Sequence, residues 1–243
     1  MPALSLTPYR QVGTPSRGGI VLVADHAGTA VPDDIPLGIG SDLMKRHIAV
    51  DIGVEGVAER MARRHDIPAH LATISRLVID LHREEDHEKL IPVESDGHLI
   101  AGNIGADRDR RVALYYRPYH DALAQWLDAA DPRLIVSLHS FTPKLESDPE
   151  EERPWDVGLL YNENSEPALR AIAMFRAQGM NVGDNEPYSG RVLNATMNRH
   201  AEAKGRDYLA IEVRQDHIAT AAGQQRWAGL IADIANRVAL MLD

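Results

Sequence analysis

The sequence feature that most constrains the fold is the apolar run at residues 134–141, LIVSLHSF. The run contains no Gly or Pro and is rich in branched side chains, so it predicts a buried strand. It ends on His139 and Ser140 and not in a turn. Open α/β sheets place their chemistry at the carboxyl ends of such strands. This run therefore predicts a central strand with a polar site at its end.

Three further apolar runs also end in polar residues that can bind a metal or an anion. They are residues 19–24 before Asp25-His26, residues 77–81 before His82-Arg83, and residues 209–211 before Glu212. A single histidine at such a place is usually a core or loop residue with no chemical role. The repetition at four strand ends is what indicates an enzyme.

The length of 243 residues predicts one α/β domain over residues 1–243, with a substantial core. The chain has no cysteine, so a metal would have to be bound by His, Asp and Glu. The formal charge of −10 argues against a nucleic-acid partner, but a local Arg cluster can still bind a small anionic substrate. The sequence shows neither a signal peptide nor a membrane-spanning run, which predicts a soluble cytoplasmic protein without a membrane partner.

His26 is a candidate metal ligand, because it follows the strand 20–24 in a loop of small residues that lets the backbone approach a ligand. Asp51 lies within residues 47–61, whose apolar spacing predicts a helix. Two interpretations of Asp51 stay open at this point. It is either a helix-capping carboxylate, favoured by the helix dipole, or a metal-binding residue.

The predicted strand 77–81 is flanked by basic residues. Alternation along it would place Arg76 and Asp80 on one face, so an ion pair between them is at least as good an interpretation as a substrate role. Arg83 stands at the end of this strand, where a guanidinium group can grip a substrate carboxylate through two hydrogen bonds.

The rest of the chain gives coarser predictions. Residues 1–18 and 182–191 are expected to be irregular, and the charged residues 84–112 to form a long loop that could close over the site as a lid. The remaining predicted strands are 69–73, 157–161 and 208–214, and the remaining helices are 115–130, 166–179, 194–203 and 219–242.

Together, these segments resemble the N-formylglutamate amidohydrolase family. The matching pieces, in the family's order, are His26-Ala27-Gly28 with Pro32, Asp51-Ile52-Gly53, residues 75–83 (SRLVIDLHR), residues 116–120 (YRPYH), residues 138–141 (LHSF), residues 185–190 (NEPYSG) and residues 210–213 (AIEV). Each piece alone is weak, but as a set they are specific.

The resemblance implies a fold like that of zinc carboxypeptidases, with a mixed, mostly parallel sheet sandwiched between helices. It also implies roles for particular residues. His26 and His139 would bind one divalent metal ion, Glu212 would act as the general base, and Arg83 would bind the substrate carboxylate. The further residues implied at the substrate are Arg76, Asn185, Tyr188 and Arg191.

Two positions depart from the expected patterns. Zinc carboxypeptidases have a Glu three residues after the first ligand histidine, whereas this chain has Thr29, so we expect Asp51 to supply the third ligand. The amidohydrolases usually have an Asn before the strand-end arginine, whereas this chain has His82. That second departure puts the family's usual substrate specificity in question.

The resemblance implies zinc-dependent hydrolysis of the amide bond of an N-formyl or N-acyl acidic amino acid, similar to N-formylglutamate, with release of formate or another small acid. Such an enzyme would belong to amino-acid catabolism, as in histidine degradation, and would be a monomer or a small homo-oligomer. One alternative is a metallocarboxypeptidase or a deacylase acting on another acidic amide. An alternative of a different class is a non-catalytic sensor of an acidic metabolite.

Overall fold

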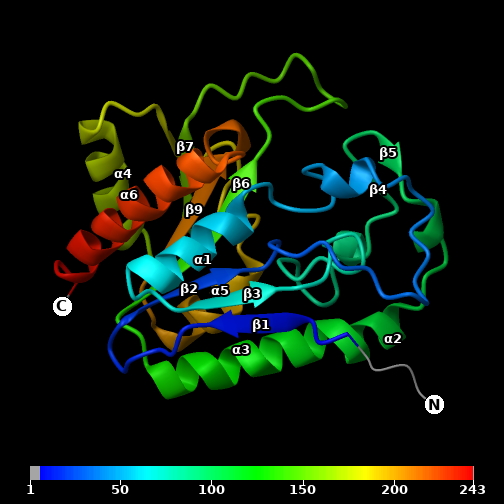
Figure 1. Cartoon of the computed structure of the whole chain (residues 1–243), viewed down its shortest axis with the longest axis horizontal. Coiled ribbons are helices and arrows are strands. Elements are labelled where there is room, and N and C mark those ends of the chain that lie inside the picture. Colours follow the sequence, from blue (N-terminus) through cyan, green and yellow to red (C-terminus); the bar gives the residue numbers. More distant parts are fainter. Residues whose placement is uncertain (1–5, 243) are drawn as a thin grey trace.

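A computed structural model describes residues 6–242. Its centre is a seven-stranded sheet with the strand order β1-β3-β2-β6-β9-β7-β8 (Figure 1). The strands are β1 (Tyr9–Val12), β2 (Ile20–Ala24), β3 (Ala69–Ala72), β6 (Leu134–Phe141), β7 (Val157–Leu160), β8 (Val182–Asp184) and β9 (Tyr208–Arg214). A separate hairpin is formed by β4 (Glu94–Ser95) and β5 (His98–Leu99).

The sheet is mixed but mostly parallel. Strands β3, β2, β6 and β9 run in the same direction, whereas β1 is antiparallel to β3 and β7 is antiparallel to β9. Because β2, β6 and β9 are parallel, their carboxyl ends lie side by side, and the polar residues at these strand ends gather in one place. In this register His139 of β6 lies directly beside Glu212 of β9.

Helices cover both faces of the sheet, as predicted. The α-helices are α1 (Val54–Arg64), α2 (Arg108–Arg111), α3 (Arg117–Ala130), α4 (Glu166–Ala177), α5 (Ala195–His200) and α6 (Ala221–Ala239). The shorter helical turns are η1 (Leu43–Lys45), η2 (Glu88–Leu90), η3 (Ala101–Asn103), η4 (Val112–Tyr116), η5 (Glu202–Lys204) and η6 (Gln215–His217). Helices α1, α4 and α6 pack on one face, and α3 and α5 pack on the other with residues 77–81 (Figure 1).

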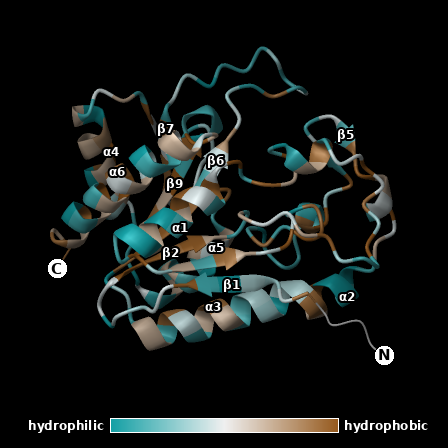
Figure 2. Cartoon of the chain, in the orientation of Figure 1, coloured by the Kyte–Doolittle hydropathy of each residue, from teal (hydrophilic) through white to brown (hydrophobic). Residues whose placement is uncertain are grey.

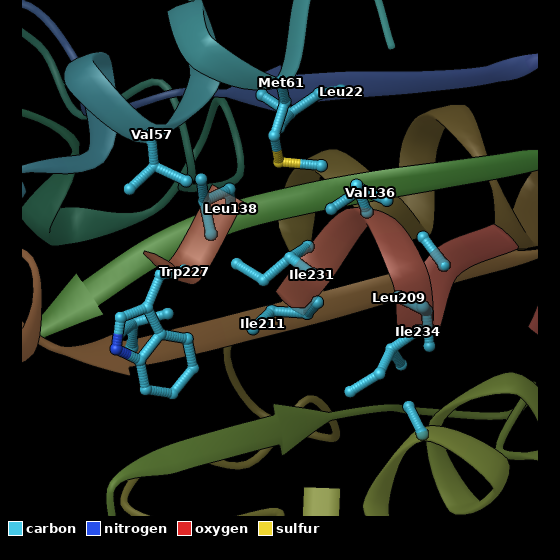
Figure 3. Packing of buried hydrophobic residues seen from close by; sticks show 14 of the residues in the cluster. Leu22, Val57, Met61, Val136, Leu138, Leu209, Ile211, Trp227, Ile231 and Ile234 are labelled. Atoms are coloured by element: carbon cyan, nitrogen blue, oxygen red, sulfur yellow. The ribbon is translucent and has the colours of Figure 1, made fainter. Parts of the chain in front are cut away.

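Alternation along β6 explains why two hydrophobic clusters form. Val136 and Leu138 face the cluster under α1, α4 and α6, whereas Ile135 faces the opposite cluster. On the first face, Met61 of α1 and Ile231 of α6 lie close over the strands (Figure 3). Burying one such side chain stabilises the fold by about 1.5–3 kcal/mol. Figure 2 shows apolar strands inside and more polar helix surfaces outside.

The structure corrects the prediction of a strand at residues 77–81. This segment forms turns, in which Val78 N donates to Ser75 O and Arg83 N donates to Asp80 O. The segment is apolar because it is buried in the cluster under α3, and a buried turn has the same pattern as a buried strand. The expected strand alternation of Arg76 and Asp80 is therefore wrong, although the two side chains do pair.

Three other boundaries also differ from the prediction. The helix expected at 47–61 begins only at Val54, because Gly53 adopts a left-handed conformation with φ 85° and turns the chain before it. Residues 1–18, expected to be irregular, contain the edge strand β1, and residues 182–191 contain β8. Both are short strands at the two edges of the sheet, which leave little periodicity in the sequence.

Among residues 6–242, no helix is long and apolar enough to cross a membrane.

Candidate active site

A cleft with a volume of about 280 Å³ opens at the carboxyl ends of β2, β6 and β9. The predicted site residues that line it are His26, Asp51, Arg76, Arg83, His139, Tyr188 and Glu212. The fold thus brings together side chains that are up to 186 positions apart in the chain, from His26 to Glu212. The size of the cleft suits a small molecule.

His26 is held rigidly at the end of β2. The following loop approaches the backbone just after β3 so closely that a Cβ atom on Gly28 would lie 2.1 Å from the carbonyl carbon of Thr73. The His26 Nε2 donates a hydrogen bond of 2.6 Å to Asp80 Oδ1. A carboxylate can only accept, so the neutral ring has its lone pair on Nδ1. This Nδ1 is buried and has no hydrogen-bond partner within residues 6–242.

Asp51 and His139 face the same point as His26. The Asp51 backbone N donates to His26 O (3.0 Å), which places the carboxylate between the two rings. Asp51 Oδ2 lies 3.0 Å from His139 Nδ1 and 3.6 Å from His26 Nδ1, and it accepts from Ser140 N. Although burial opposes ionisation, His26 and His139 hold the pKa of Asp51 below its ordinary value.

These three side chains fit a metal ion. One ligand atom from each of His26, Asp51 and His139 lies within 4.8 Å of the others, and all three residues are buried. Two imidazoles and a carboxylate are a common ligand set of zinc enzymes. The helix-capping interpretation of Asp51 is not supported, since α1 begins after Gly53 and Asp51 makes no side-chain cap.

Asp80 lies near both of the arginines that were predicted at the site, Arg76 and Arg83. Its Oδ2 accepts from Arg76 NH2 at 2.8 Å and lies 3.6 Å from Arg83 Nε. Arg76 NH1 also donates to Asp51 Oδ1 at 3.3 Å. Burial alone would raise the pKa of Asp80, but Arg76 and His26 hold it well below its ordinary value. Arg76 therefore uses both terminal nitrogens on the carboxylates beside His26, which matches the ion-pair interpretation of the sequence.

Arg83 differs from Arg76 in the use of its guanidinium group. Its Nε lies near Asp80, but its two terminal nitrogens donate no hydrogen bond to any residue of the range 6–242. The side chain lines the cleft and is partly exposed there. Arg83 is thus the arginine of this pair that has donors available for a ligand carboxylate.

Glu212 is a buried carboxyl group that lines the cleft. Burial raises the pKa of Glu212 to about 7. Its Oε2 is buried and has no hydrogen-bond partner in the part of the chain that the structure describes. Arg214, the basic residue two positions further along β9, bonds Asp216 at 2.8 Å and not Glu212. A carboxyl group with a pKa near neutrality can both accept and return a proton.

The predicted substrate residues of the loop after β8 are not all at the cleft. Tyr188 lines it, whereas Asn185 and Arg191 do not. Asn185 has a left-handed backbone (φ 55°), and its Oδ1 accepts from Tyr161 N and Gly190 N, both at 2.9 Å. Asn185 therefore shapes the turn that presents Tyr188. Arg191 is exposed outside the cleft.

Several residues in and around the cleft were not among the predicted site residues. Asp25 is buried beside His139, and Tyr119 donates to its Oδ1 at 2.6 Å. Arg153 donates to the Tyr188 hydroxyl at 3.0 Å and lies over its ring. Asp25 and Tyr119 belong to sequence pieces that were noted, but Arg153 lies in an acidic loop without any periodic signal.

The charged segment 84–112 contributes to the rim of the cleft. It contains the β4–β5 hairpin, from which Ser95 and Asp96 line the cleft. Asp96 Oδ1 also accepts from Ser147 N at 2.8 Å, which connects the hairpin to the loop after β6. A lid movement of this segment stays a prediction.

Comparisons with known proteins place the chain in a family. The family model of N-formylglutamate amidohydrolase matches residues 18–219. The crystal structure of a gene product from Agrobacterium tumefaciens is similar with a TM-score of 0.89 and 27% identity, covering 96% of this chain and 95% of that one. N-formylglutamate amidohydrolase from Ralstonia eutropha JMP134 shares the fold, with a TM-score of 0.76, 20% identity and 98% coverage of both chains. No curated protein sequence matched significantly. The chain belongs to the N-formylglutamate amidohydrolase family and is a hydrolytic enzyme.

Proposed function

We propose that this enzyme is a zinc-dependent hydrolase that cleaves the amide bond of an N-formyl or N-acyl acidic amino acid, such as N-formylglutamate. One observation carries the proposal. The buried, unpartnered Nδ1 of His26 faces Asp51 and His139 in the same cleft that contains the unpartnered Oε2 of Glu212. A binding protein without catalysis has no need of a carboxyl group with a raised pKa beside a metal-ligand set.

His26, Asp51 and His139 would hold the metal ion. Imidazole and carboxylate groups are ligand types that suit zinc. When bound, the ion acts as a Lewis acid toward the amide carbonyl and the attacking water. The protein prepares this site through Asp80, which fixes the tautomer and orientation of His26 through the 2.6 Å hydrogen bond.

Glu212 would move the proton. As the water oxygen bonds to the carbonyl carbon, Glu212 takes a proton from the water, and it returns this proton to the nitrogen as the C–N bond breaks. The products are a carboxylic acid, formate in the case of an N-formyl substrate, and a free amino acid. The pKa of Glu212 of about 7 suits both transfers.

Arg83 would select the substrate. Its two terminal nitrogens are available in the cleft, and a guanidinium group can bind a carboxylate through two parallel hydrogen bonds. The small cleft favours an amino-acid derivative over a peptide. The family to which the chain belongs, N-formylglutamate amidohydrolase, supports the same class of small anionic substrate.

Metal analysis of the purified protein, combined with a hydrolysis screen over N-formyl and N-acyl amino acids, tests the proposal. We expect about one zinc ion per chain and faster hydrolysis of acidic than of neutral derivatives. The His26→Ala/His139→Ala variant should lose both metal and activity. His98→Ala is the matched control. His98 lies in β5 of the hairpin, pairs with Glu146 and is not part of the ligand group. Unchanged metal content in the double variant would refute the site.

A further inference from the structure

His82 lies in the cleft in a fixed tautomer. Its Nδ1 lies 2.9 Å from Asp25 Oδ2 and 3.1 Å from Thr196 Oγ1. Asp25 is 1% exposed, and its other oxygen already accepts from the Tyr119 hydroxyl at 2.6 Å. A carboxylate cannot donate, so the proton of the neutral His82 ring is on Nδ1.

The other nitrogen of His82 is therefore a hydrogen-bond acceptor. His82 lines the cleft, and its side chain is 13% exposed. Its Nε2 makes no hydrogen bond within residues 6–242, and it is not among the fully buried polar atoms without a partner. The lone pair on Nε2 therefore faces the open space of the cleft, where a ligand can reach it.

The position of His82 limits which atoms of a bound ligand can reach its Nε2. His82 directly precedes Arg83, and its ring centroid lies 4.6 Å from that of His139. It thus lies close to one proposed metal ligand and is next in sequence to the arginine proposed to bind the carboxylate. In an N-acyl acidic amino acid, the side-chain carboxylate is joined to the reacting carbonyl carbon through the side-chain carbons, Cα and the amide nitrogen.

We propose that His82 determines specificity by accepting a hydrogen bond at Nε2 from the N–H of the amide that is cleaved. His82 would then select N-acyl derivatives of primary amino acids and disfavour the corresponding esters, whose oxygen would oppose the Nε2 lone pair. The same lone pair would repel a carboxylate, so His82 does not extend the anion-binding role of Arg83. This inference rests on the proposed function and specifies the substrate of that site.

Two substitutions of His82 test the roles of its two ring nitrogens separately. In His82→Asn, the side-chain amide can replace Nδ1 as the donor to Asp25, but nothing replaces Nε2. In His82→Gln, the amide reaches the Nε2 position, but the contact with Asp25 is lost. The pair thus distinguishes the acceptor in the cleft from the anchoring of the ring, and both variants keep a polar side chain.

Binding should be measured by calorimetry on zinc-loaded protein in the Glu212→Gln background, so that the ligands are not hydrolysed. The ligands are N-acetylglutamate and 2-acetoxyglutarate, which differ only in an amide N–H against an ester oxygen. With His82 present, we expect the amide to bind about tenfold more tightly or better. His82→Asn should abolish this preference, whereas His82→Gln should retain part of it.

The measured outcomes separate this inference from the proposed function. If the protein with both His82 and Glu212 hydrolyses N-acyl acidic amino acids but the Glu212→Gln protein binds amide and ester equally, only the role of His82 is wrong. Failure to hydrolyse any N-formyl or N-acyl acidic amino acid in the screen, together with failure to bind either compound, overturns both. Zinc content should stay the same in His82→Asn. A loss of zinc would assign His82, with Asp25 and His139, to metal binding and would overturn the inference.

Discussion

Replacing Asp80 with Asn tests how the protein prepares His26 for a metal. Asp80 Oδ1 accepts from His26 Nε2, and Oδ2 accepts from Arg76 NH2. An asparagine has only one acceptor oxygen. If this oxygen faces His26, the side-chain NH2 group faces the Arg76 guanidinium group, and two hydrogen-bond donors then meet without an acceptor. If the amide is reversed, its N–H faces His26 Nε2 and moves the ring proton to Nδ1, the atom that would bind the metal.

The expected effect of Asp80→Asn follows from these contacts. Removing a residue that orients a metal-binding histidine typically weakens metal affinity by about 10–100-fold. Such a loss corresponds to about 1.4–2.8 kcal/mol, in the range expected for one unsatisfied buried polar group. Asp80 is 4% exposed, so water cannot replace the lost contact easily.

Competition with a chromogenic chelator measures the zinc affinity, and urea unfolding of the metal-free protein measures its stability. Asp128→Asn is a matched control, since Asp128 is an exposed carboxylate paired with Arg206 outside the cleft. We expect weaker zinc binding in Asp80→Asn and an unchanged affinity in Asp128→Asn. A wild-type zinc affinity in Asp80→Asn would refute the assignment of Asp80 as the residue that orients His26.

Three further predictions follow from the site and the core. Asp51→Asn should weaken zinc binding at least about tenfold, and intact zinc binding with only a lower melting temperature would instead indicate a structural role. Arg83→Lys keeps the charge but loses the planar fork, so kcat/KM should fall for acidic and not for neutral substrates, whereas an equal loss for both would make Arg83 structural. Burial lowers the folded-state pKa of His120 to about 3 and of His200 to about 4. Below about pH 6.5 the unfolded chain therefore binds more protons than the folded one. The free energy of unfolding should fall as the pH drops through this range. Urea unfolding measures the free energy of unfolding at pH 7 and at pH 5. From pH 7 to pH 5, this free energy should fall by about 2 kcal/mol less in His200→Gln than in wild type. An equal fall in both proteins would show that His200 does not contribute to the pH dependence.

The sequence predicted the central strands well for a physical reason. Strands β2, β6 and β9 are buried on both faces, so each appears as a mostly apolar run that leads to a polar residue. The same signal failed at Leu77–Leu81, because a turn buried under α3 is equally apolar. The edge strands β1 and β8 were missed because they have only one neighbour each and little periodicity.

The candidate site was predictable where one residue follows one strand, as for His26, His139 and Glu212. It was less predictable where a role depends on contacts between distant segments. Asp25 is next to His26 in the chain, and strand alternation would send the two side chains to opposite sides. Both nevertheless lie close to His139, with Asp25 Oδ2 3.7 Å from its Nε2 and the His26 ring centroid 5.0 Å from its own ring centroid.

The role of Asp80 in holding His26 was equally hidden, since the two residues are 54 positions apart. The sequence indicated only its pairing with Arg76. Asn185 shows the opposite case, because its motif matched the family while its side chain serves the turn and does not line the cleft. A motif therefore locates a loop, but the side chain that reaches the ligand is decided by the backbone of that loop.

The central claim, that Glu212 is the base of a metal-dependent amide hydrolysis, is tested most directly by the single-turnover rate of Glu212→Gln. Zinc content, substrate affinity and the unfolding midpoint are measured on the same preparation. A positioned base contributes about a hundredfold to ten-thousandfold. We predict that the rate falls by this factor while zinc content and substrate affinity are preserved. A near-normal rate per folded molecule, with or without a lower unfolding midpoint, would contradict the claim.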